Sequence, residues 1–320
     1  MRVSAVLEPT GVTGVVRFVS ALGRRHPHVA VFGAVHGNEP CGLRAIERLY
    51  AEILADELVL SAGTLTLVHG NPPASELQER HTRGGVDLNR QFDYRFLDDI
   101  PPHHWTYEHS RALELQPLLE SVDVVLDLHS TTAPAPAFAI ASPLPSSLEL
   151  AVALGLPYVT QGWESPGLLG DRVLIAPLTR RGLPGVSIEC GQHEERPAVD
   201  VAYACLRRGL EYLGMIAALP VAPVAASCTH LWITAAVKRP SSSFRFARPF
   251  ESMQELRAGE LIGCDEVLAL SAQCHCYVIM PNDSVSVGDD MLYLARSLDA
   301  GESGMRASED PAVQPLGARG

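Results

Sequence analysis

The sequence has 320 residues, enough for one large domain or for a medium domain joined to a small one. Hydrophobic residues make up 47% of the chain and charged residues 19%, so the chain can bury a core and is not disordered as a whole. The formal net charge of -12 argues against nucleic acid and against an anionic membrane surface as partners. A small anionic substrate is still compatible, because local arginines can oppose the overall charge.

No export or membrane segment is expected. Glu8 and Pro9 interrupt the first apolar residues, which is not typical of a signal peptide. The apolar run at residues 215–226 contains Pro220 and Pro223 and is too short to cross a bilayer. The seven cysteines are scattered without a CxxC pair, which favours reduced thiols and a cytoplasmic protein.

Strand and helix patterns alternate over the first two thirds of the chain. Buried strands are predicted at residues 28–33, 65–68, 122–128 and 185–190, and helices at 43–58, 109–116, 148–154 and 197–219, with Pro117 ending or kinking the second helix. This alternation predicts an α/β fold with a mostly parallel or mixed sheet and helices on both of its faces.

After residue 220 the pattern changes to short strands separated by turns. Such strands are predicted at residues 231–238, 263–269, 275–280 and 291–295. We therefore expect an α/β domain over residues 1–220, a linker over 220–227, a small β-rich domain over 228–298 and a disordered tail over 299–320.

A histidine and a glutamate stand three residues apart in the segment GAVHGNEP, residues 33–40. The segment follows a predicted strand and precedes a helix, so the side chains of His36 and Glu39 can converge on one point. An imidazole and a carboxylate at this spacing suit zinc. The alternative is a capping turn, in which Asn38 or Glu39 binds the N–H groups at the start of the helix.

Three more segments carry polar groups at strand ends or in a loop. His129 in DLHS ends a predicted strand and would be a third ligand or a core residue. Glu189 lies in the apolar strand GVSIEC, where a carboxylate is costly unless it is used or paired, so a catalytic carboxyl of raised pKa is the functional interpretation. Arg90 in DLNR could hold a carboxylate in a two-point fork, or lie in a surface turn.

The placement of these residues is more informative than any one of them. His36, His129 and Glu189 all fall at the carboxyl ends of predicted parallel strands, where open α/β sheets place their sites. Three protein ligands with an open fourth position are typical of a catalytic zinc site.

Five motifs in this order, GAVHGNEP, GNPPA, DLNRQFD, DLHSTT and SIECG, resemble the succinylglutamate desuccinylase/aspartoacylase family of the wider zinc carboxypeptidase-like group. The strand-rich C-terminal part also resembles the small domain of that family. The resemblance implies one zinc ion per chain, bound by His36, Glu39 and His129 with a water in the fourth position. It also implies that Glu189 is the general base and then the general acid.

The same resemblance assigns substrate contacts to several polar side chains. Asn89 and Arg90 correspond to the pair that grips the α-carboxylate of the substrate. An arginine shortly before DLNR lies near the oxyanion in the family; Arg83 fits this place with a one-residue deletion and Arg80 with a short insertion, and we prefer Arg83.

A further arginine in aspartoacylases precedes the strand of the general base and meets a second carboxylate. Arg180 or Arg181 lies in that region, and a solvated loop is the alternative.

These implications predict hydrolysis of the amide bond of a small, anionic N-acyl amino acid, with Glu189 activating the water. The motifs do not decide between an aspartoacylase-like and a desuccinylase-like substrate. A metallocarboxypeptidase that cleaves peptides and a zinc-free binding protein of the same fold are the alternatives. No nucleic acid or membrane partner is expected, and association into a homo-oligomer stays open.

Overall fold

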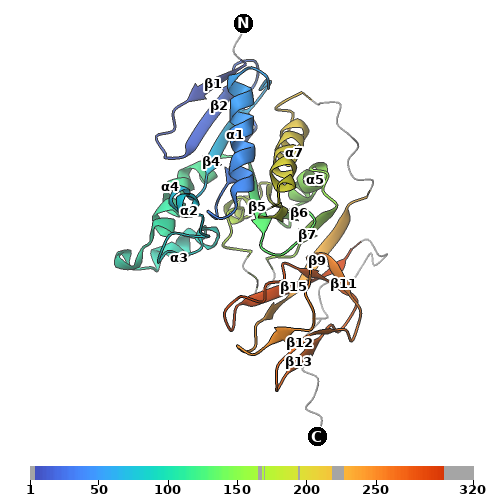
Figure 1. Cartoon of the computed structure of the whole chain (residues 1–320). Coiled ribbons are helices and arrows are strands. Elements are labelled where there is room, and N and C mark those ends of the chain that lie inside the picture. The colour runs from blue at the N-terminus through green and yellow to red at the C-terminus, as the bar shows by residue number, and fades with distance from the viewer. Residues whose placement is uncertain (1–3, 165–167, 169, 194, 218–226, 299–320) are drawn as a thin grey trace.

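The computed structural model of the chain describes residues 4–164, 168, 170–193, 195–217 and 227–298 (Figure 1). The predicted tail at 299–320 and all but the last residue of the predicted linker at 220–227 lie outside the described residues.

Helices and strands alternate over the N-terminal two thirds, and strands dominate the rest. The helices are α1 (Pro40–Leu54), α2 (Pro72–Leu77), α3 (Tyr94–Asp98), α4 (Tyr107–Ser121), α5 (Pro145–Ala153), α6 (Ala176–Arg180) and α7 (Pro197–Tyr212), with short 3-10 turns η1 (Leu88–Arg90) and η2 (Pro102–His104). The strands are β1 (Ala5–Glu8), β2 (Val15–Ser20), β3 (His28–Gly33), β4 (Thr64–His69), β5 (Val124–Thr131), β6 (Phe138–Ala141), β7 (Tyr158–Gln161), β8 (Gly185–Gln192), β9 (Thr229–Lys238), β10 (Arg245–Phe246), β11 (Gln254–Leu256), β12 (Leu261–Cys264), β13 (Ala269–Ser271), β14 (Cys276–Ile279) and β15 (Asp290–Ser297). Within the described part of the chain, no helix has the length and apolar character to span a membrane.

Twelve strands form one mixed sheet in the order β1-β2-β4-β3-β5-β8-β6-β7-β9-β15-β14-β11. The central strands β4, β3, β5 and β8 are parallel to one another, whereas β6 is antiparallel to β8. A separate three-stranded sheet has the order β10-β12-β13. The expected α/β fold with a mixed sheet is therefore confirmed.

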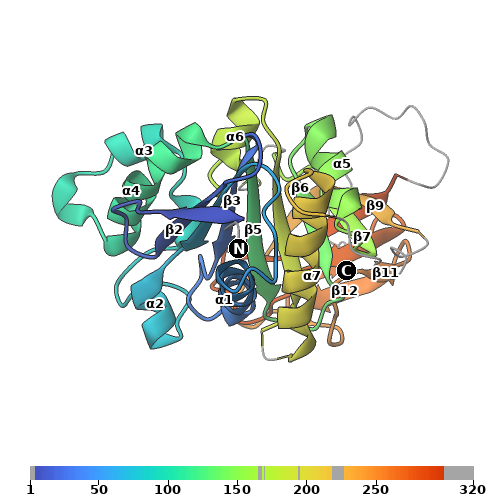
Figure 2. The same ribbon diagram turned by 90° about the horizontal axis from the view of Figure 1, so that it is seen from above.

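Helices cover both faces of the central sheet, which explains why β3, β5 and most of β8 are buried along their length. On one face, Leu49 of α1 and Leu206 of α7 belong to the same buried cluster. On the other face, Leu115 of α4 packs in a second cluster with Leu178 of α6. Figure 2 shows these helix pairs on opposite sides of β3 and β5.

The β-rich C-terminal part continues the large sheet. Strand β9 pairs in parallel with β7, and β15 then pairs with β9 in antiparallel fashion. This part has a buried cluster of its own, which includes Val237, Leu256 and Leu294. In Figure 1 its strands lie below the layers that α1 and α7 form.

Several sequence predictions about element boundaries are wrong; the helix predicted to residue 219, for example, ends at Tyr212. Helix α4 continues through Pro117 to Ser121, and Pro117 lies on its exposed side, where water can bind the carbonyl group that a proline leaves without a helical N–H donor. The strand predicted at 263–269 is instead a hairpin. Asp265 Oδ1 accepts hydrogen bonds from the N–H groups of Val267 and Leu268, at 2.8 and 2.7 Å, and these bonds form the turn between β12 and β13.

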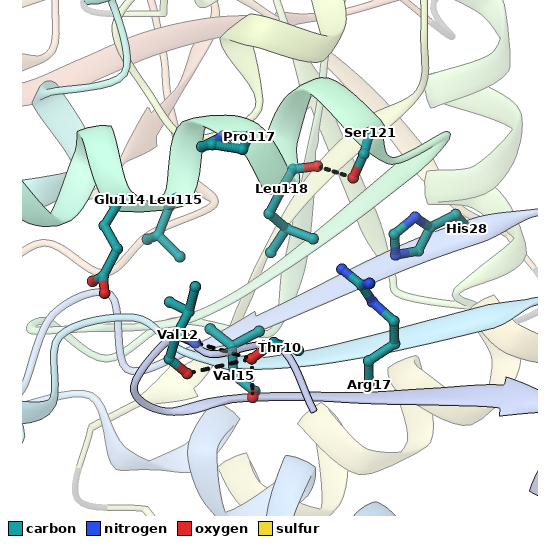
Figure 3. A pocket seen from close by; sticks show the side chains of 10 residues that line it. All are labelled: Thr10, Val12, Val15, Arg17, His28, Glu114, Leu115, Pro117, Leu118 and Ser121. Carbon is teal, nitrogen blue, oxygen red and sulfur yellow. Dashed lines mark hydrogen bonds between the residues drawn. The ribbon is translucent and has the colours of Figure 1, made fainter. Parts of the chain in front are cut away.

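A hollow of about 430 Å³ lies between α4 and β2 (Figure 3). Glu114 lies at one end and Arg17 with His28 at the other, and the apolar side chains of Val15 and Leu115 lie between them. None of the residues that the sequence singled out for chemistry lines this hollow.

Candidate metal centre and active site

His36, Glu39 and His129 converge at the carboxyl ends of the central strands. His36 and Glu39 lie in the turn between β3 and α1, and His129 lies near the end of β5. One potential ligand atom from each residue lies within 4.8 Å of the others, and all three residues are buried. Nδ1 of His36 is 2.8 Å from Glu39 Oε1, and Nδ1 of His129 is 2.9 Å from Glu39 Oε2.

Two glycines allow the backbone around this turn to lie close to its neighbours. A Cβ atom at Gly37 would lie 2.1 Å from the carbonyl carbon of Ala74. A Cβ at Gly42, in the first turn of α1, would lie 2.6 Å from the Cβ of Leu128, the residue before His129. The start of α1 can therefore approach β5 closely enough for Glu39 to reach His129.

A carboxylate lies against the other ring nitrogen of each histidine. Nε2 of His36 is 2.9 Å from Oδ1 of Asp87, and Nε2 of His129 is 2.8 Å from Oδ2 of Asp127. If each Nε2 carries the proton that binds these carboxylates, the lone pair of each Nδ1 is directed toward Glu39. Carboxylate–histidine pairs of this kind orient the histidine ligands of zinc sites, so the donor set fits a zinc ion.

The electrostatics of the group follow from buried opposite charges. Burial alone would raise the pKa of Glu39, but the imidazoles of His36 and His129 hold it well below its ordinary value. Burial alone would lower the pKa of His129, but Asp127 and Glu39 raise it well above its ordinary value, so without a metal ion both of its ring nitrogens carry protons at neutral pH, and a zinc ion would displace the proton of Nδ1. Glu39 is therefore an ionised acceptor at neutral pH.

Glu189 lies on β8 directly opposite His129 in the parallel pairing of β5 and β8. Its side chain is buried, and within the described part of the chain its Oε2 atom has no hydrogen-bond partner. Burial raises the pKa of Glu189 to about 7. A carboxyl group with this pKa can both take up and release a proton near neutral pH.

Of the two arginines before DLNR, the structure places Arg80 beside the candidate ligands. Its guanidinium group donates to Asp87 Oδ2 at 2.8 Å and lies 3.5 Å from Glu39 Oε1. Arg83, which the sequence analysis preferred, has a side chain that is 79% exposed, and its ion pair is with Glu79 at 3.8 Å. Arg80 stands seven residues before Asp87, and the residues between them form a loop that brings the two side chains together.

Asn89 and Arg90 lie two and three residues after Asp87, in the turn η1. Nδ2 of Asn89 lies 3.3 Å from Nε2 of His129, while its Oδ1 accepts the N–H of Leu174 at 2.7 Å. Arg90 donates from its guanidinium group to the carbonyl oxygen of Asn89 at 2.9 Å. Both side chains therefore belong to the neighbourhood of the candidate centre.

Arg180 and Arg181 bind backbone carbonyl groups. Arg180 donates to the oxygen of Phe92 at 2.8 Å, and Arg181 donates to the oxygen of Leu119 at 2.6 Å. Both guanidinium groups thus tie α6 to neighbouring segments. A substrate contact for one of these two arginines stays a prediction.

A match to a known family model shows to which protein family the chain belongs. Residues 25–195, just over half of the chain, match the model of the succinylglutamate desuccinylase/aspartoacylase catalytic domain.

This protein belongs to the succinylglutamate desuccinylase/aspartoacylase family.

Curated members of the family are similar over part of their length. An N-acyl-aromatic-L-amino acid amidohydrolase (carboxylate-forming) of Rattus norvegicus is 37% identical over 119 residues, which are 35% of this chain and 36% of that protein. A probable aspartoacylase of a Nostoc species is 37% identical over 112 residues, 33% of this chain and 35% of that protein. A succinylglutamate desuccinylase of Erwinia tasmaniensis is 37% identical over 75 residues, 23% of this chain and 22% of that protein. The matched segments therefore span about a third or less of these relatives.

Solved structures of the family share the fold over most of the chain. A succinylglutamate desuccinylase of Vibrio parahaemolyticus has a TM-score of 0.72 at 16% identity, over 93% of this chain and 89% of that chain. The ectoine utilization protein EutE of Ruegeria pomeroyi, solved with product bound, has a TM-score of 0.69 at 19% identity, over 92% and 99% of the two chains.

Two residues near the family motifs were not singled out by the sequence. Tyr293 of β15 lies outside the residues that match the catalytic-domain model. Burial raises its pKa to about 12, while the charges of Arg90 and Arg80 act to lower it. Glu108 of α4 is buried beside the loop that carries Arg80. A glutamate in the first turn of a helix carries no signal that distinguishes it from a surface residue.

Proposed function

We propose that this protein is a zinc-dependent deacylase that hydrolyses the amide bond of a small, anionic N-acyl amino acid. The observation that carries the proposal is the pairing of each histidine Nε2 with an aspartate, while each Nδ1 lies within 2.9 Å of Glu39. The membership of the chain in the family supports the same reaction class. The names of the curated relatives describe amidohydrolase, aspartoacylase and desuccinylase activities.

The chemistry divides between one metal ion and the side chains around it. A zinc ion held by His36, Glu39 and His129 would polarise the scissile carbonyl and lower the pKa of a water molecule. Glu189 takes a proton from the attacking water and passes it to the departing amine nitrogen, as its buried position and its raised pKa allow. Arg80 stabilises the negative charge that develops on the carbonyl oxygen.

Two further side chains orient the substrate. Asn89 and Arg90 hold its α-carboxylate and so place the amide bond beside the candidate metal ligands. Arg80 and Arg90 would supply positive charge for the carboxylates of the substrate in a protein whose formal net charge is -12. This local charge supports an anionic substrate.

The β-rich part at 228–298 acts as a cap that favours small substrates over peptides. Tyr293 of this part lies close enough to Arg80 and Arg90 for their charges to act on its pKa. The N–H of Ser252 also donates to the carbonyl oxygen of Pro134, in the segment after β5, at 3.2 Å. A long peptide would need an open groove where these contacts lie.

A hydrolysis screen tests the proposal. Zinc-loaded protein is incubated with N-acetylaspartate, N-succinylglutamate, N-acyl aromatic amino acids and peptides, and the release of primary amine is measured. Each N-acyl substrate is paired with its α-methyl ester, which should react much more slowly because it cannot form the ion pair with Arg90. Release from peptides alone would indicate a metallocarboxypeptidase, and release from no substrate would refute the proposal.

A further inference from the structure

The carboxylate of Glu108 is fully buried in the first turn of α4 and receives four hydrogen bonds. Oε1 accepts from Asn71 Nδ2 at 3.2 Å and from the N–H of Thr82 at 2.8 Å. Oε2 accepts from the N–H of Val86 at 3.3 Å and from the hydroxyl of Thr106 at 2.9 Å. Each oxygen therefore accepts two hydrogen bonds, one for each of its lone pairs.

Two of these donors are backbone groups at opposite ends of one short segment. Thr82 and Val86 enclose the turn that connects Arg80 to Asp87. The carboxylate of Glu108 thus holds this loop, residues 79–87, at two points that are four residues apart.

The loop held in this way carries the two side chains that contact the candidate metal ligands. Arg80 lies 3.5 Å from Glu39, and Asp87 lies 2.9 Å from Nε2 of His36. Arg80 and Asp87 also bind each other, at 2.8 Å. Displacement of the loop would therefore change both contacts together.

The sequence of the loop is suited to this anchor. A Cβ atom at Gly85 would lie 2.4 Å from Oε2 of Glu108 and 2.8 Å from the carbonyl oxygen of Thr82, so a larger residue would force the loop or the carboxylate to shift and would disturb the contact between them. Burial alone would raise the pKa of Glu108, but the N–H of Thr82 and the other donors hold it below its ordinary value. The anchor is therefore a charged acceptor at neutral pH, and hydrogen bonds to such a group are stronger than those between neutral groups.

We propose that Glu108 is a positioning residue of the active site, which holds the loop of residues 79–87 so that Arg80 and Asp87 stay against Glu39 and His36. Glu108 touches neither the substrate nor the metal ligands and acts through Arg80 and Asp87. The inference rests on the proposed function for its effect on catalysis, but the anchoring of the loop stands apart from it.

The test compares Glu108→Gln with Glu120→Gln, an equal change at an exposed position of the same helix. Glu108→Gln presents an NH2 group where one oxygen now accepts. Hydrogen exchange at the amides of Thr82 and Val86 should accelerate at least about tenfold in this variant and stay unchanged in the control. At saturating zinc, kcat should fall about 10–100-fold, with KM changed less than about threefold.

A double-mutant comparison with Arg80→Ala distinguishes a positioning role of Glu108 from a general effect on protein stability. In an Arg80→Ala background, Glu108→Gln should lower kcat by a clearly smaller factor than in the wild-type background, because one of the two side chains that it positions is already gone. Equal losses in both backgrounds, or unchanged exchange at Thr82 and Val86, would overturn the inference.

The same measurements distinguish a failure of the proposed function from a failure of the inference about Glu108. If the wild-type protein hydrolyses no N-acyl amino acid, the proposed function fails, and the exchange rates alone decide whether Glu108 anchors the loop. If Glu108→Gln does not fold, Gly85→Ala replaces it, because the added methyl group would clash with the carboxylate and with the carbonyl oxygen of Thr82 and so disturb the anchor while Glu108 itself is kept. Exchange at Val86 that matches the wild type in Gly85→Ala would count against the anchor.

Discussion

Oδ1 of Asp87 lies 2.9 Å from Nε2 of His36, while Oδ2 of the same carboxylate accepts a hydrogen bond from Arg80 at 2.8 Å. One side chain thereby orients a proposed metal ligand and the arginine proposed for the oxyanion. Asp127 lies against Nε2 of His129 in the same way, at 2.8 Å.

Removal of Asp87 should weaken zinc binding. We expect Asp87→Ala to lower zinc affinity about 10–100-fold, because the ring of His36 loses the acceptor that fixes its orientation. Competition with a fluorescent chelator measures this affinity. Asp98→Ala, which removes an exposed acid in the nearby α3, is the matched control and should bind zinc like the wild type. Equal affinities for all three proteins would show that Asp87 does not support His36.

Arg80 and Arg83 offer a direct comparison between neighbouring arginines. Arg80→Ala should lower kcat about 100- to 1,000-fold, the usual cost of a lost oxyanion donor. Arg83→Ala should stay within about twofold of the wild type, because this exposed side chain pairs only loosely with Glu79, at 3.8 Å. Steady-state kinetics on the best substrate of the screen decides the question. A large loss in Arg83→Ala with little loss in Arg80→Ala would reverse the assignment.

Replacement of Glu189 should separate catalysis from metal binding. Glu189→Gln keeps the size of the side chain but cannot take up the proton of the attacking water. Turnover should fall by at least about 100-fold, the lower range for a lost general base. Zinc content, measured on the same preparation by elemental analysis, should stay at one ion per chain. A variant with a near-native rate would rule out Glu189 as the base.

The stability of the protein should show the lowered pKa of Glu108. A carboxyl group whose pKa is lowered in the folded state stabilises that state at pH values above its ordinary pKa of 4.5. This stabilisation is lost as the pH falls through the lower pKa of the folded state. The Tm of the wild type should therefore exceed that of Glu108→Gln at pH 6, and the difference should narrow below about pH 4. A difference that stays constant between pH 6 and pH 3 would contradict this account.

The buried strands and the ligand motifs were predictable because each has a local pattern. Residues 28–33 form a short apolar run followed by the HxxE turn, and the structure has a strand with the same bounds. Arg180 and Arg181 could not be told apart from the sequence, because sequence position does not show which backbone carbonyl groups accept hydrogen bonds from their guanidinium groups. Arg80 could not be chosen over Arg83 because the path of the intervening loop depends on Glu108, a residue more than 20 positions further along the chain. Contacts of this kind are fixed by tertiary packing and not by local propensity.

Amide hydrolysis by this protein should depend on a zinc ion that His36, Glu39 and His129 hold. The most direct measurement follows amine release from the best N-acyl amino acid of the screen before chelation, after chelation, and after zinc is added back. Release should stop on chelation and return to its full rate at one equivalent of zinc per chain. Release that is unaffected by complete removal of the metal would contradict the dependence on zinc.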